Sequence, residues 1–574
     1  MKRTGSALLI EALKAEKVDI LFGFPGGVVI PAFDALYGER AIRLVLARHE
    51  QGAVHAADGY ARSTGRVGVC LVTSGPGATN TVTGLATANF DSVPLVVISG
   101  QVSRNMIGND AFQEADIVGI SRSVTKHNYL VTDRKDLGRI LREAFHIART
   151  GRPGPVLVDV PKDVLTEASD EPLPETVSIR GYNPVYRGHP LQIRKAAEVL
   201  AASKKPLFYA GGGLTISGGA MLFRELVART GVPVVASLMG IGALPSDNPR
   251  FLGMLGMHGT YAANMAVQTC DLLFAIGSRF DDRATGNLKT FAPHAAVVHV
   301  DIDPASIARN VQVEVPIVGD ARLFLEDFLP IARAPEIAAW QAQTEDWMRT
   351  HPLADVPGNG GLSPSQVIRA IAKAFPSAIV TTEVGQNQMW TAQYYDFHEP
   401  RTFLTSGGLG TMGYGFPAAI GAQLGNPDRR VIDIAGDGSI QMNIQELGTA
   451  VAEKVPVIVA ILNNGYLGMV RQWQESFHAR RYSGVCLNRA VDCPPDCASP
   501  GGACPPYAPD FVKLAEAYGA AGMRILQPSE IEPALAEAAR ITDRPVFLDF
   551  RISREANVWP MVPAGAGIDE MMNA

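Results

Sequence analysis

The stretch RVIDIAGDGSIQMNIQELGTAVAEKVPVIVAILNN, residues 430–464, decides the fold that we expect for this chain. It starts with an apolar run that ends near Asp437, continues with a segment of helical periodicity, and finishes in a second apolar run that ends at Asn464. This order predicts a strand, a helix and a second strand joined by a right-handed crossover, with the two strands parallel. Asp437 and Asn464 then emerge at the same edge of one sheet.

That edge has the chemistry of a site for a metal ion and a phosphate group. Asp437 and Asn464 stand 27 residues apart and offer the oxygen ligands that Mg²⁺ takes when it bridges a protein and a phosphate. Gly436 and Gly438 let backbone amides approach the phosphate, and the following helix presents its N-terminus to it. Each short motif alone is better explained as a tight turn. The pair within one strand–helix–strand unit predicts a binding site.

Apolar runs alternate with helical patterns along all 574 residues, which predicts an α/β protein with three doubly wound parallel-sheet domains. Two polar, proline-containing stretches, roughly 166–190 and 345–364, look like linkers. The domains expected from these boundaries cover residues 1–165, 190–345 and 362–574.

The first and third domains look like distant repeats of each other. SGPG (74–77) and AGDG (435–438) are each followed by a helical stretch and a strand that begins with Val-Pro. This shared order indicates duplication. Two related α/β domains are suited to hold one ligand between them, because such sheets bind ligands at the carboxyl ends of their strands.

Composition and charge narrow the class of protein. The chain has 47% hydrophobic and 19% charged residues and a net charge of -6, which leaves no basic footprint for nucleic acid. The apolar run near the N-terminus is too short for a signal peptide, and no run approaches the length of a membrane span. We expect a cytoplasmic protein without a membrane or nucleic-acid partner.

Long motifs outside the opening stretch carry a family resemblance over essentially the whole chain. They are GFPGG (23–27), SGPGATN (74–80), GQVSRNMIGNDAFQEADIVGISRSVTKHNYLV (100–131), RPGPVLVDVPKDV (152–164), LGMLGMHG (252–259), GSRFDDR (277–283), VDIDP (300–304), TSGGLGTMGYGFPAAIGA (405–422) and LGMVRQWQ (467–474). Together with the Asp437 and Asn464 pair, they resemble the thiamine-diphosphate enzymes, and within them the catalytic subunits of acetolactate synthases.

The resemblance implies an activity and three cofactors. Members of the family decarboxylate pyruvate and condense the resulting enamine with pyruvate or 2-ketobutyrate, the first common step of branched-chain amino-acid biosynthesis. Thiamine diphosphate and Mg²⁺ serve this chemistry. FAD is expected in the middle domain with a structural or vestigial role, because the reaction does not need it. The first domain would bind the pyrimidine of the cofactor and the third its diphosphate.

Glu50 is the residue that the resemblance assigns to the pyrimidine ring. It lies in LARHEQGA (46–53), after the strand-like 42–47, and is expected to open a helix. In the family this glutamate comes from the partner subunit and hydrogen-bonds to the aminopyrimidine. Without the motif, an acidic residue in the first turn of a helix would be explained by the helix dipole alone.

The resemblance also implies roles for three further groups of residues. Contacts to thiamine diphosphate are expected from Gly385, Gln386, Asn387, Gly410, Met412, Gly438, Ser439 and Met469, and the third metal ligand from the backbone carbonyl of Tyr466. The substrates are expected at Phe112, Gln113, Lys126, Arg279, Val470 and Trp473, with Gln113 and Lys126 counted as catalytic together with Glu50. FAD is expected at Arg152, His258, Arg279, Asp301 and Asp320. Asp301 follows a strand, like the ribose-binding acid of dinucleotide domains.

Two features depart from the family pattern. Asn387 stands where the family commonly has histidine, and we expect its amide to donate to a phosphate oxygen with reduced contact. A cysteine- and proline-rich insert covers 486–509 and contains Cys486, Cys493, Cys497 and Cys504. Their spacing lacks the paired pattern of zinc sites, so a loop without metal, a metal site and a disulfide all remain open. The insert follows the helix expected to line the substrate site, where it could form part of a lid.

Alternative interpretations of the sequence are a pyruvate oxidase, a 2-ketoacid decarboxylase, a glyoxylate carboligase, or a catalytically silent flavin-binding regulatory homologue. Glyoxylate carboligase lacks the glutamate found here as Glu50, and a silent homologue has no need of Asp437 and Asn464. The resemblance further implies a homodimer or homotetramer, because two chains share each cofactor, and allows a small regulatory subunit.

Overall fold

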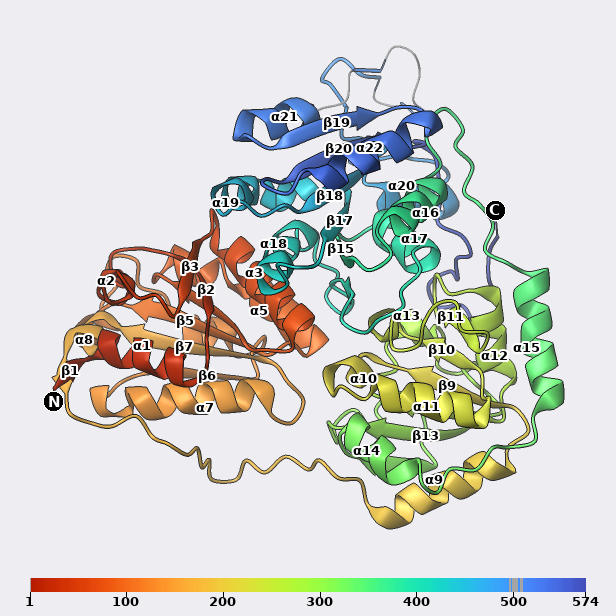
Figure 1. Ribbon diagram of the computed structural model, residues 1–574, viewed down its shortest axis with the longest axis horizontal. Coiled ribbons are helices and arrows are strands. Elements are labelled where there is room, and N and C mark those ends of the chain that lie inside the picture. Colours follow the sequence, from red (N-terminus) through yellow and green to blue (C-terminus); the bar gives the residue numbers. More distant parts are fainter. Residues whose placement is uncertain (1, 495–496, 498–503, 506–508, 574) are drawn as a thin grey trace.

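Three six-stranded sheets dominate the computed structural model, which describes residues 2–494, 497, 504–505 and 509–573 (Figure 1). All neighbouring strands of these sheets whose pairing is described run parallel. The fold class of three parallel-sheet α/β domains is therefore confirmed. Within the described residues, no helix is both long and apolar enough to cross a bilayer.

The N-terminal sheet has the strand order β3-β2-β4-β5-β7-β6. Its strands are β2 (Ile20–Phe24), β3 (Arg43–Leu46), β4 (Gly68–Val72), β5 (Leu95–Gln101), β6 (His127–Leu130) and β7 (Pro155–Pro161). The helices of this part are α1 (Gly5–Ala15), α2 (Ile30–Leu36), α3 (Glu50–Thr64), α4 (Pro76–Thr79), α5 (Val82–Asp91), α6 (Ile117–Ser121), α7 (Leu137–Arg149) and α8 (Lys162–Thr166). A short antiparallel pair, β1 (Arg3–Thr4) with β8 (Ala168–Ser169), ties its two ends together.

The C-terminal sheet has the order β16-β15-β17-β18-β20-β19, which is the same topology strand for strand. Its strands are β15 (Ile379–Thr382), β16 (Phe403–Leu404), β17 (Val431–Gly436), β18 (Ile458–Asn463), β19 (Ala521–Ile525) and β20 (Val546–Arg551). Its helices are α16 (Pro364–Ala374), α17 (Gln386–Tyr394), α18 (Gly415–Gly425), α19 (Leu447–Ala452), α20 (Gly468–Phe477), α21 (Phe511–Tyr518) and α22 (Pro528–Arg540). The shared strand order supports the duplication inferred from the glycine turns.

The middle sheet has a different order, β11-β10-β9-β12-β13-β14, which is that of dinucleotide-binding domains. Its strands are β9 (Pro206–Ala210), β10 (Val234–Ala236), β11 (Phe251–Met254), β12 (Leu272–Ile276), β13 (Ala296–Asp301) and β14 (Val315–Val318). Its helices are α9 (Pro190–Ala202), α10 (Gly212–Ile216), α11 (Ala220–Thr230), α12 (Tyr261–Thr269), α13 (Asp282–Thr285), α14 (Ala321–Phe328) and α15 (Ala338–Thr350).

The opening stretch folds as expected at its strands and differs in its helix. β17 and β18 pair in parallel, with Gly436 opposite Leu462. The segment between them starts as a 3₁₀ helix (Ile440–Glu446) and only then becomes α19. Asn443 breaks the helix with φ -133°, while its side-chain amide donates to the carbonyl of Gly413 at 2.7 Å. A tertiary contact therefore replaces the first helical turns.

Within one chain, the N- and C-terminal domains pack through α3 and α18 (Figure 1). The helices approach so closely that a Cβ at Gly59 would lie 2.0 Å from the carbonyl oxygen of Ala418. The last segment of the chain leaves the C-terminal domain and returns to the middle domain. There the amide of Val562 donates to the carbonyl of Met257 at 2.8 Å, and that of Asn287 to Ala566 at 3.0 Å.

Candidate active site

The carboxyl ends of β17 and β18 bring the predicted metal ligands together. Asp437 follows β17, and its Oδ2 accepts a hydrogen bond from the amide of Gly465 at 2.8 Å. Asn464 follows β18, and its Oδ1 accepts from the amide of Tyr466 at 2.9 Å. The two strand ends are thus joined directly, as the parallel crossover requires.

Asp437 has the environment of a carboxylate built for a cation. It is 5% exposed, and burial raises its pKa to about 7. A buried carboxylate is costly unless a partner charge compensates it. Asp437 is the only acidic residue of the predicted metal set, so a bound Mg²⁺ would need further oxygens from a phosphate. The donor set fits Mg²⁺ held together with a diphosphate.

Gly438 and Met412 lie next to each other at this edge. A Cβ at Gly438 would lie 3.9 Å from the Cε of Met412 and 2.7 Å from the Cδ2 of Leu467. The space beside the Asp437 turn is therefore open only to a residue without a side chain. Met412 is half-buried, in the loop that connects β16 to α18. The cradle agrees with a ligand whose phosphate lies at the turn and whose rings lie against Met412.

The amides of Gln386 and Asn387, at the start of α17, are already engaged inside the domain. Gln386 donates to Gln472 at 3.0 Å and to the carbonyl of Ala556 at 2.8 Å. Asn387 donates both of its amide hydrogens, to the carbonyls of Glu383 and Ile434, at 3.1 and 2.8 Å. For Asn387 to donate to a phosphate as expected from the sequence, its side chain must turn.

Glu50 opens α3, as expected, and it is buried. Its Oε2 accepts a hydrogen bond from the side chain of Asn80 at 2.9 Å. Among the described contacts, none joins Glu50 to Asp437 or Asn464 of the same chain. Glu50 and the metal pair therefore lie in two separate parts of one chain.

The other predicted residues of the N-terminal domain do not gather at the Asp437 edge either. Phe112 is 87% exposed, and Gln113 has the left-handed φ of 59°. Lys126 donates to the carbonyls of Ile147 and Thr150 and to the hydroxyl of Tyr182, at 2.6, 2.5 and 2.9 Å. Burial, with a smaller contribution from Arg152, lowers the pKa of Lys126 to about 8.

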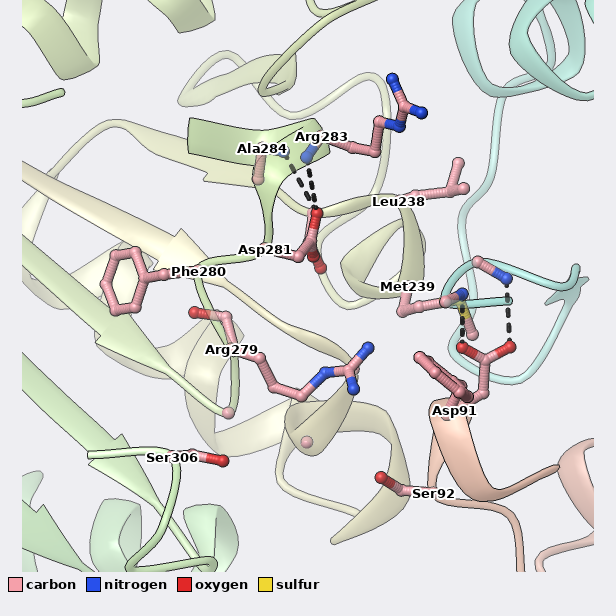
Figure 2. Close-up of a pocket in the computed structure, with 18 of the residues that line it drawn as sticks. Asp91, Ser92, Leu238, Met239, Arg279, Phe280, Asp281, Arg283, Ala284 and Ser306 are labelled. Carbon is pink, nitrogen blue, oxygen red and sulfur yellow. Dashed lines mark hydrogen bonds between the residues drawn. The ribbon is translucent and has the colours of Figure 1, made fainter. Parts of the chain in front are cut away.

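A cavity of about 1100 Å³ opens between the three domains (Figure 2). It brings together many of the residues predicted for the cofactors and the second substrate. From the predicted sets, its walls contain Arg152, His258, Arg279, Asp301, Asp320, Gly385, Gly410, Met469 and Trp473. The other predicted residues are not among its walls: Glu50, Phe112, Gln113, Lys126, Gln386, Asn387, Met412, Asp437, Gly438, Ser439, Asn464, Tyr466 and Val470.

The middle-domain wall of this cavity fits a dinucleotide. The start of α10, just after β9, approaches the turn after β12 so closely that a Cβ at Gly213 would lie 2.7 Å from the Cα of Gly277. Asp301 ends β13 at the same edge of the sheet, and burial raises its pKa to about 6. A glycine turn, a strand-end acid and this strand order form the pattern of dinucleotide sites.

Comparison with known proteins identifies the family. The chain matches thiamine pyrophosphate enzymes in their N-terminal TPP binding domain over residues 3–120, their central domain over 193–328 and their C-terminal TPP binding domain over 383–550. The acetolactate synthase large subunit of Corynebacterium glutamicum is 48% identical over 581 residues, covering 100% of this chain and 90% of that protein. The isozyme 3 large subunit of Escherichia coli is 48% identical, covering 99% and 98%, and the large subunit of Haemophilus influenzae 46% identical, covering 100% and 98%.

This chain belongs to the acetolactate synthase family of thiamine pyrophosphate enzymes. The resemblance found in the sequence is confirmed, and the rival readings outside this family are set aside.

One arginine of the acetolactate synthase motif RFDDR was missed by the sequence reasoning. Arg283 begins α13 with Asp282, and its guanidinium carbon lies 5.7 Å from the centre of the Trp473 ring. Arg279 points elsewhere, toward the loop at Gly408, where a Cβ would lie 3.1 Å from its Nη2 (Figure 2). The motif has two arginines four residues apart. Their side chains point in different directions, which the structure shows and the sequence does not.

The start of the cysteine-rich insert is fastened to the predicted metal loop of this acetolactate synthase chain. Cys486 forms an antiparallel bridge with Tyr466, and the amide of Leu487 donates to Gly465 at 2.9 Å. Residues 495–496, 498–503 and 506–508 of the insert lie outside the described residues. Cys486 and Cys493 are free thiols, and the described part of the chain has no group of three His, Cys, Asp or Glu side chains that could hold a metal.

Proposed function

We propose that this chain is the catalytic subunit of an acetolactate synthase of branched-chain amino-acid biosynthesis. It decarboxylates pyruvate and joins the remaining two-carbon unit to a second pyruvate or to 2-ketobutyrate. The observation that carries the proposal is the hydrogen bond from the Gly465 amide to Asp437, which joins the Asp437 turn to the loop of Asn464 beside the Gly438–Met412 cradle. The relatives at 46–48% identity carry the name of this enzyme over essentially the whole chain.

Asp437, Asn464 and the carbonyl of Tyr466 would hold Mg²⁺, and Gly438 and Ser439 the diphosphate. Gly385, Gln386, Asn387, Gly410, Met412 and Met469 would surround the rest of thiamine diphosphate. When bound, thiamine diphosphate supplies the carbon nucleophile of the reaction. Glu50 of the partner subunit would hold a proton against the aminopyrimidine, the general acid–base role that suits a buried carboxyl group.

Gln113 and Lys126, with Phe112, would line the path of the first ketoacid from the N-terminal domain. The second ketoacid would bind at Trp473 and Val470 on α20. For its carboxylate we favour Arg283 over Arg279, because Arg283 lies over the Trp473 ring. A guanidinium can pair a carboxylate through two parallel hydrogen bonds.

FAD would occupy the middle-domain wall of the large cavity, held by Arg152, His258, Arg279, Asp301 and Asp320. The close approach of Gly213 to Gly277 and the strand order of the middle sheet support this assignment. Its role would be structural. We further propose a cytoplasmic homodimer or homotetramer that can take up a small regulatory subunit.

The test is turnover by the purified chain with pyruvate, thiamine diphosphate, Mg²⁺ and FAD, with acetolactate as the measured product. The variant Glu50→Gln should lose nearly all turnover, because a neutral amide cannot supply the proton of a carboxyl group. The control Glu11→Gln changes a partly exposed ion pair with Arg3, near the chain start in the N-terminal domain, and should leave turnover unchanged. Absence of acetolactate from the unmodified chain, with and without a regulatory subunit, overturns the proposal.

A further inference from the structure

The N-terminal domain of a chain holds the cofactor loop of its own C-terminal domain, residues 405–412, through Asp91. Asp91 ends α5, and its carboxylate points into the loop. Its Oδ2 accepts from the amide of Gly407 at 3.0 Å, and its Oδ1 from the amide of Gly408 at 2.8 Å. Two consecutive backbone amides of the loop are thus fixed by one side chain.

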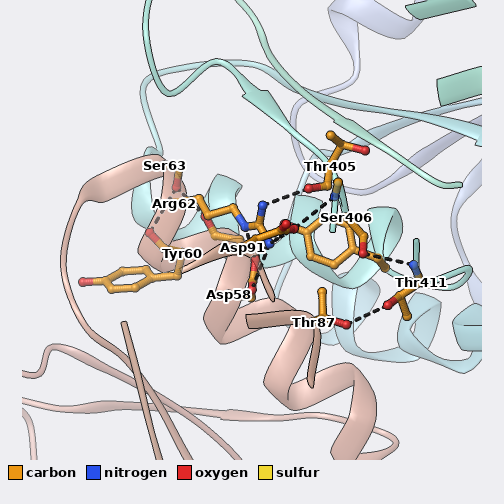
Figure 3. A network of polar contacts seen from close by, with 12 residues as sticks. Asp58, Tyr60, Arg62, Ser63, Thr87, Asp91, Thr405, Ser406 and Thr411 are labelled. Atoms are coloured by element: carbon orange, nitrogen blue, oxygen red, sulfur yellow. Dashed lines mark hydrogen bonds and ion pairs between the residues drawn. The ribbon is translucent and has the colours of Figure 1, made fainter. Parts of the chain in front are cut away.

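The same carboxylate belongs to a buried ion network with Arg62 and Asp58 of α3 (Figure 3). Arg62 donates to Asp58 at 2.5 Å, to Asp91 at 3.0 Å and to the carbonyl of Thr405 at 2.8 Å. The side chains of Asp58 and Asp91 are 0% exposed, and that of Arg62 is 8% exposed. Two carboxylates face one guanidinium, so the amides of Gly407 and Gly408 compensate part of the remaining negative charge.

The loop reaches Asp91 only because it has glycines there. A Cβ at Gly408 would lie 2.9 Å from the Oδ1 of Asp91, and one at Gly407 would lie 2.6 Å from the Sδ of Met239. A side chain at Gly408 would push the loop away from the carboxylate, and one at Gly407 would displace the side chain of Met239. The close approach and the two hydrogen bonds therefore depend on each other.

The far end of the loop is held from the same face of α5. The hydroxyl of Thr87, one helical turn before Asp91, lies 2.7 Å from that of Thr411. The amide of Thr411 also donates to the hydroxyl of Ser406 at 3.0 Å (Figure 3). The segment between these two anchors contains Gly410, a wall of the large cavity, and Met412 follows directly after Thr411.

We infer that Asp91 is a positioning residue that sets the shape of loop 405–412 for thiamine diphosphate. The inference rests on the proposed function, in which Gly410 and Met412 contact that cofactor. Asp91 itself would touch neither the thiazolium nor the substrate. It acts through the amides of Gly407 and Gly408, whose place decides where the loop presents Gly410 and Met412.

The test is Asp91→Asn in the full chain, which keeps the size of the side chain. One carboxylate oxygen becomes an NH₂ group, which cannot accept a hydrogen bond from a backbone amide of the loop. We expect the apparent KM for thiamine diphosphate to rise about tenfold or more, since a charge-assisted hydrogen bond to the loop is lost. The kcat at saturating cofactor should stay within about threefold. Hydrogen exchange of the Gly407 and Gly408 amides should become faster.

The matched control is Glu16→Gln. The Glu16 side chain is 2% exposed and pairs with Arg142 and Arg149, within the N-terminal domain. It should lower thermal stability without changing the KM for thiamine diphosphate. Thr87→Val, which removes only the second anchor, should raise that KM by less than Asp91→Asn and serves if Asp91→Asn does not fold.

An active unmodified enzyme with an unchanged cofactor KM in both Asp91→Asn and Thr87→Val overturns the inference. An unmodified chain that binds no thiamine diphosphate and makes no acetolactate instead overturns the proposed function. The two failures are therefore distinguishable.

Discussion

The guanidinium carbon of Arg283 lies 5.7 Å from the centre of the Trp473 ring, and both residues line the cavity between the three domains. A cation above an indole face, on a cavity wall, is a ready partner for a carboxylate. We expect Arg283→Gln to raise the KM of the second ketoacid by about tenfold or more, because a charge-assisted pair is lost. Formation of acetolactate at varied pyruvate, and of acetohydroxybutyrate at varied 2-ketobutyrate, measures this KM. Arg279→Gln is the matched control, and a larger effect there than at Arg283 would contradict the assignment.

Asp437 should make metal binding depend on pH. Burial raises its pKa to about 7, and only the ionised carboxylate can bind Mg²⁺. The affinity for Mg²⁺ at saturating thiamine diphosphate should therefore fall about tenfold between pH 7.5 and pH 6. Titration calorimetry at several pH values measures this dependence. In Asp437→Asn binding should be weak and nearly independent of pH. A steep pH dependence that survives in this variant would exclude Asp437 as its source.

Glu383 and Asp433 should make the cofactor-free protein less stable as the pH rises. Burial raises the pKa of Glu383 from 4.5 to about 7, and burial together with Glu383 holds the pKa of Asp433 well above its ordinary value. A carboxyl group with a raised pKa binds more protons in the folded state. The stability it contributes is present below about pH 4.5 and is lost as the pH rises through about 7.

The variant Asp433→Asn tests this pair. It removes one of the two carboxyl groups and with it part of the pH dependence. Between pH 5 and pH 8 the free energy of unfolding should fall in both proteins. The fall should be smaller in the variant by roughly 1–3 kcal/mol. Urea unfolding at both pH values measures the difference. Asp327→Asn, at an ion pair on the surface, is the control and should keep the full dependence. An equal change of the unfolding free energy with pH in all three proteins would rule out Glu383 and Asp433 as its cause.

Gly213→Ala should impair FAD binding. The new Cβ would lie 2.7 Å from the Cα of Gly277, so the start of α10 would have to move away from the turn after β12. We expect FAD affinity to fall about tenfold or more, since the turn shapes the dinucleotide site. The increase in flavin fluorescence after dilution of the FAD-loaded protein measures the release of FAD. Gly212→Ala meets Met239 at 3.0 Å and should have a milder effect. Full flavin retention in Gly213→Ala would argue against a dinucleotide at this turn.

Much of the fold was predictable because the strands of parallel sheets are buried on both faces and read as continuous apolar runs. β17 and β18 were expected from such runs, and both are buried. The segment between them, QMNIQELGTAVAEK (441–454), was expected to be helical. Its first turns are a broken 3₁₀ helix because Asn443 bonds to Gly413. That contact depends on tertiary structure and leaves no periodic signal in the sequence.

The candidate site was predictable where a long motif identifies a residue. It was less predictable where the role of a residue depends on the direction of its side chain. Asp437, Asn464 and Glu50 follow from motif and strand order, and the structure confirms that Glu50 opens a helix. Arg283 and Arg279 share one motif, and their distinct directions depend on a ring almost 200 residues further along the chain. Asp91 reads in the sequence as an ordinary acidic residue at the end of a helix. Its buried place appears only when two domains come together.

Glu50 and Asp437 lie in separate domains of one chain, with no described contact between them. If two subunits complete each site, a chain with a defect in one residue still contributes a sound copy of the other. Glu50→Gln and Asp437→Asn should each be inactive alone. After mixing and reassembly, the hybrid dimer should regain one intact site, a complementation measured as returning acetolactate formation. Persistent inactivity of properly mixed hybrids would indicate that each chain works alone. Regained activity would instead show that the duplicated sheet is a means of sharing catalysis between chains.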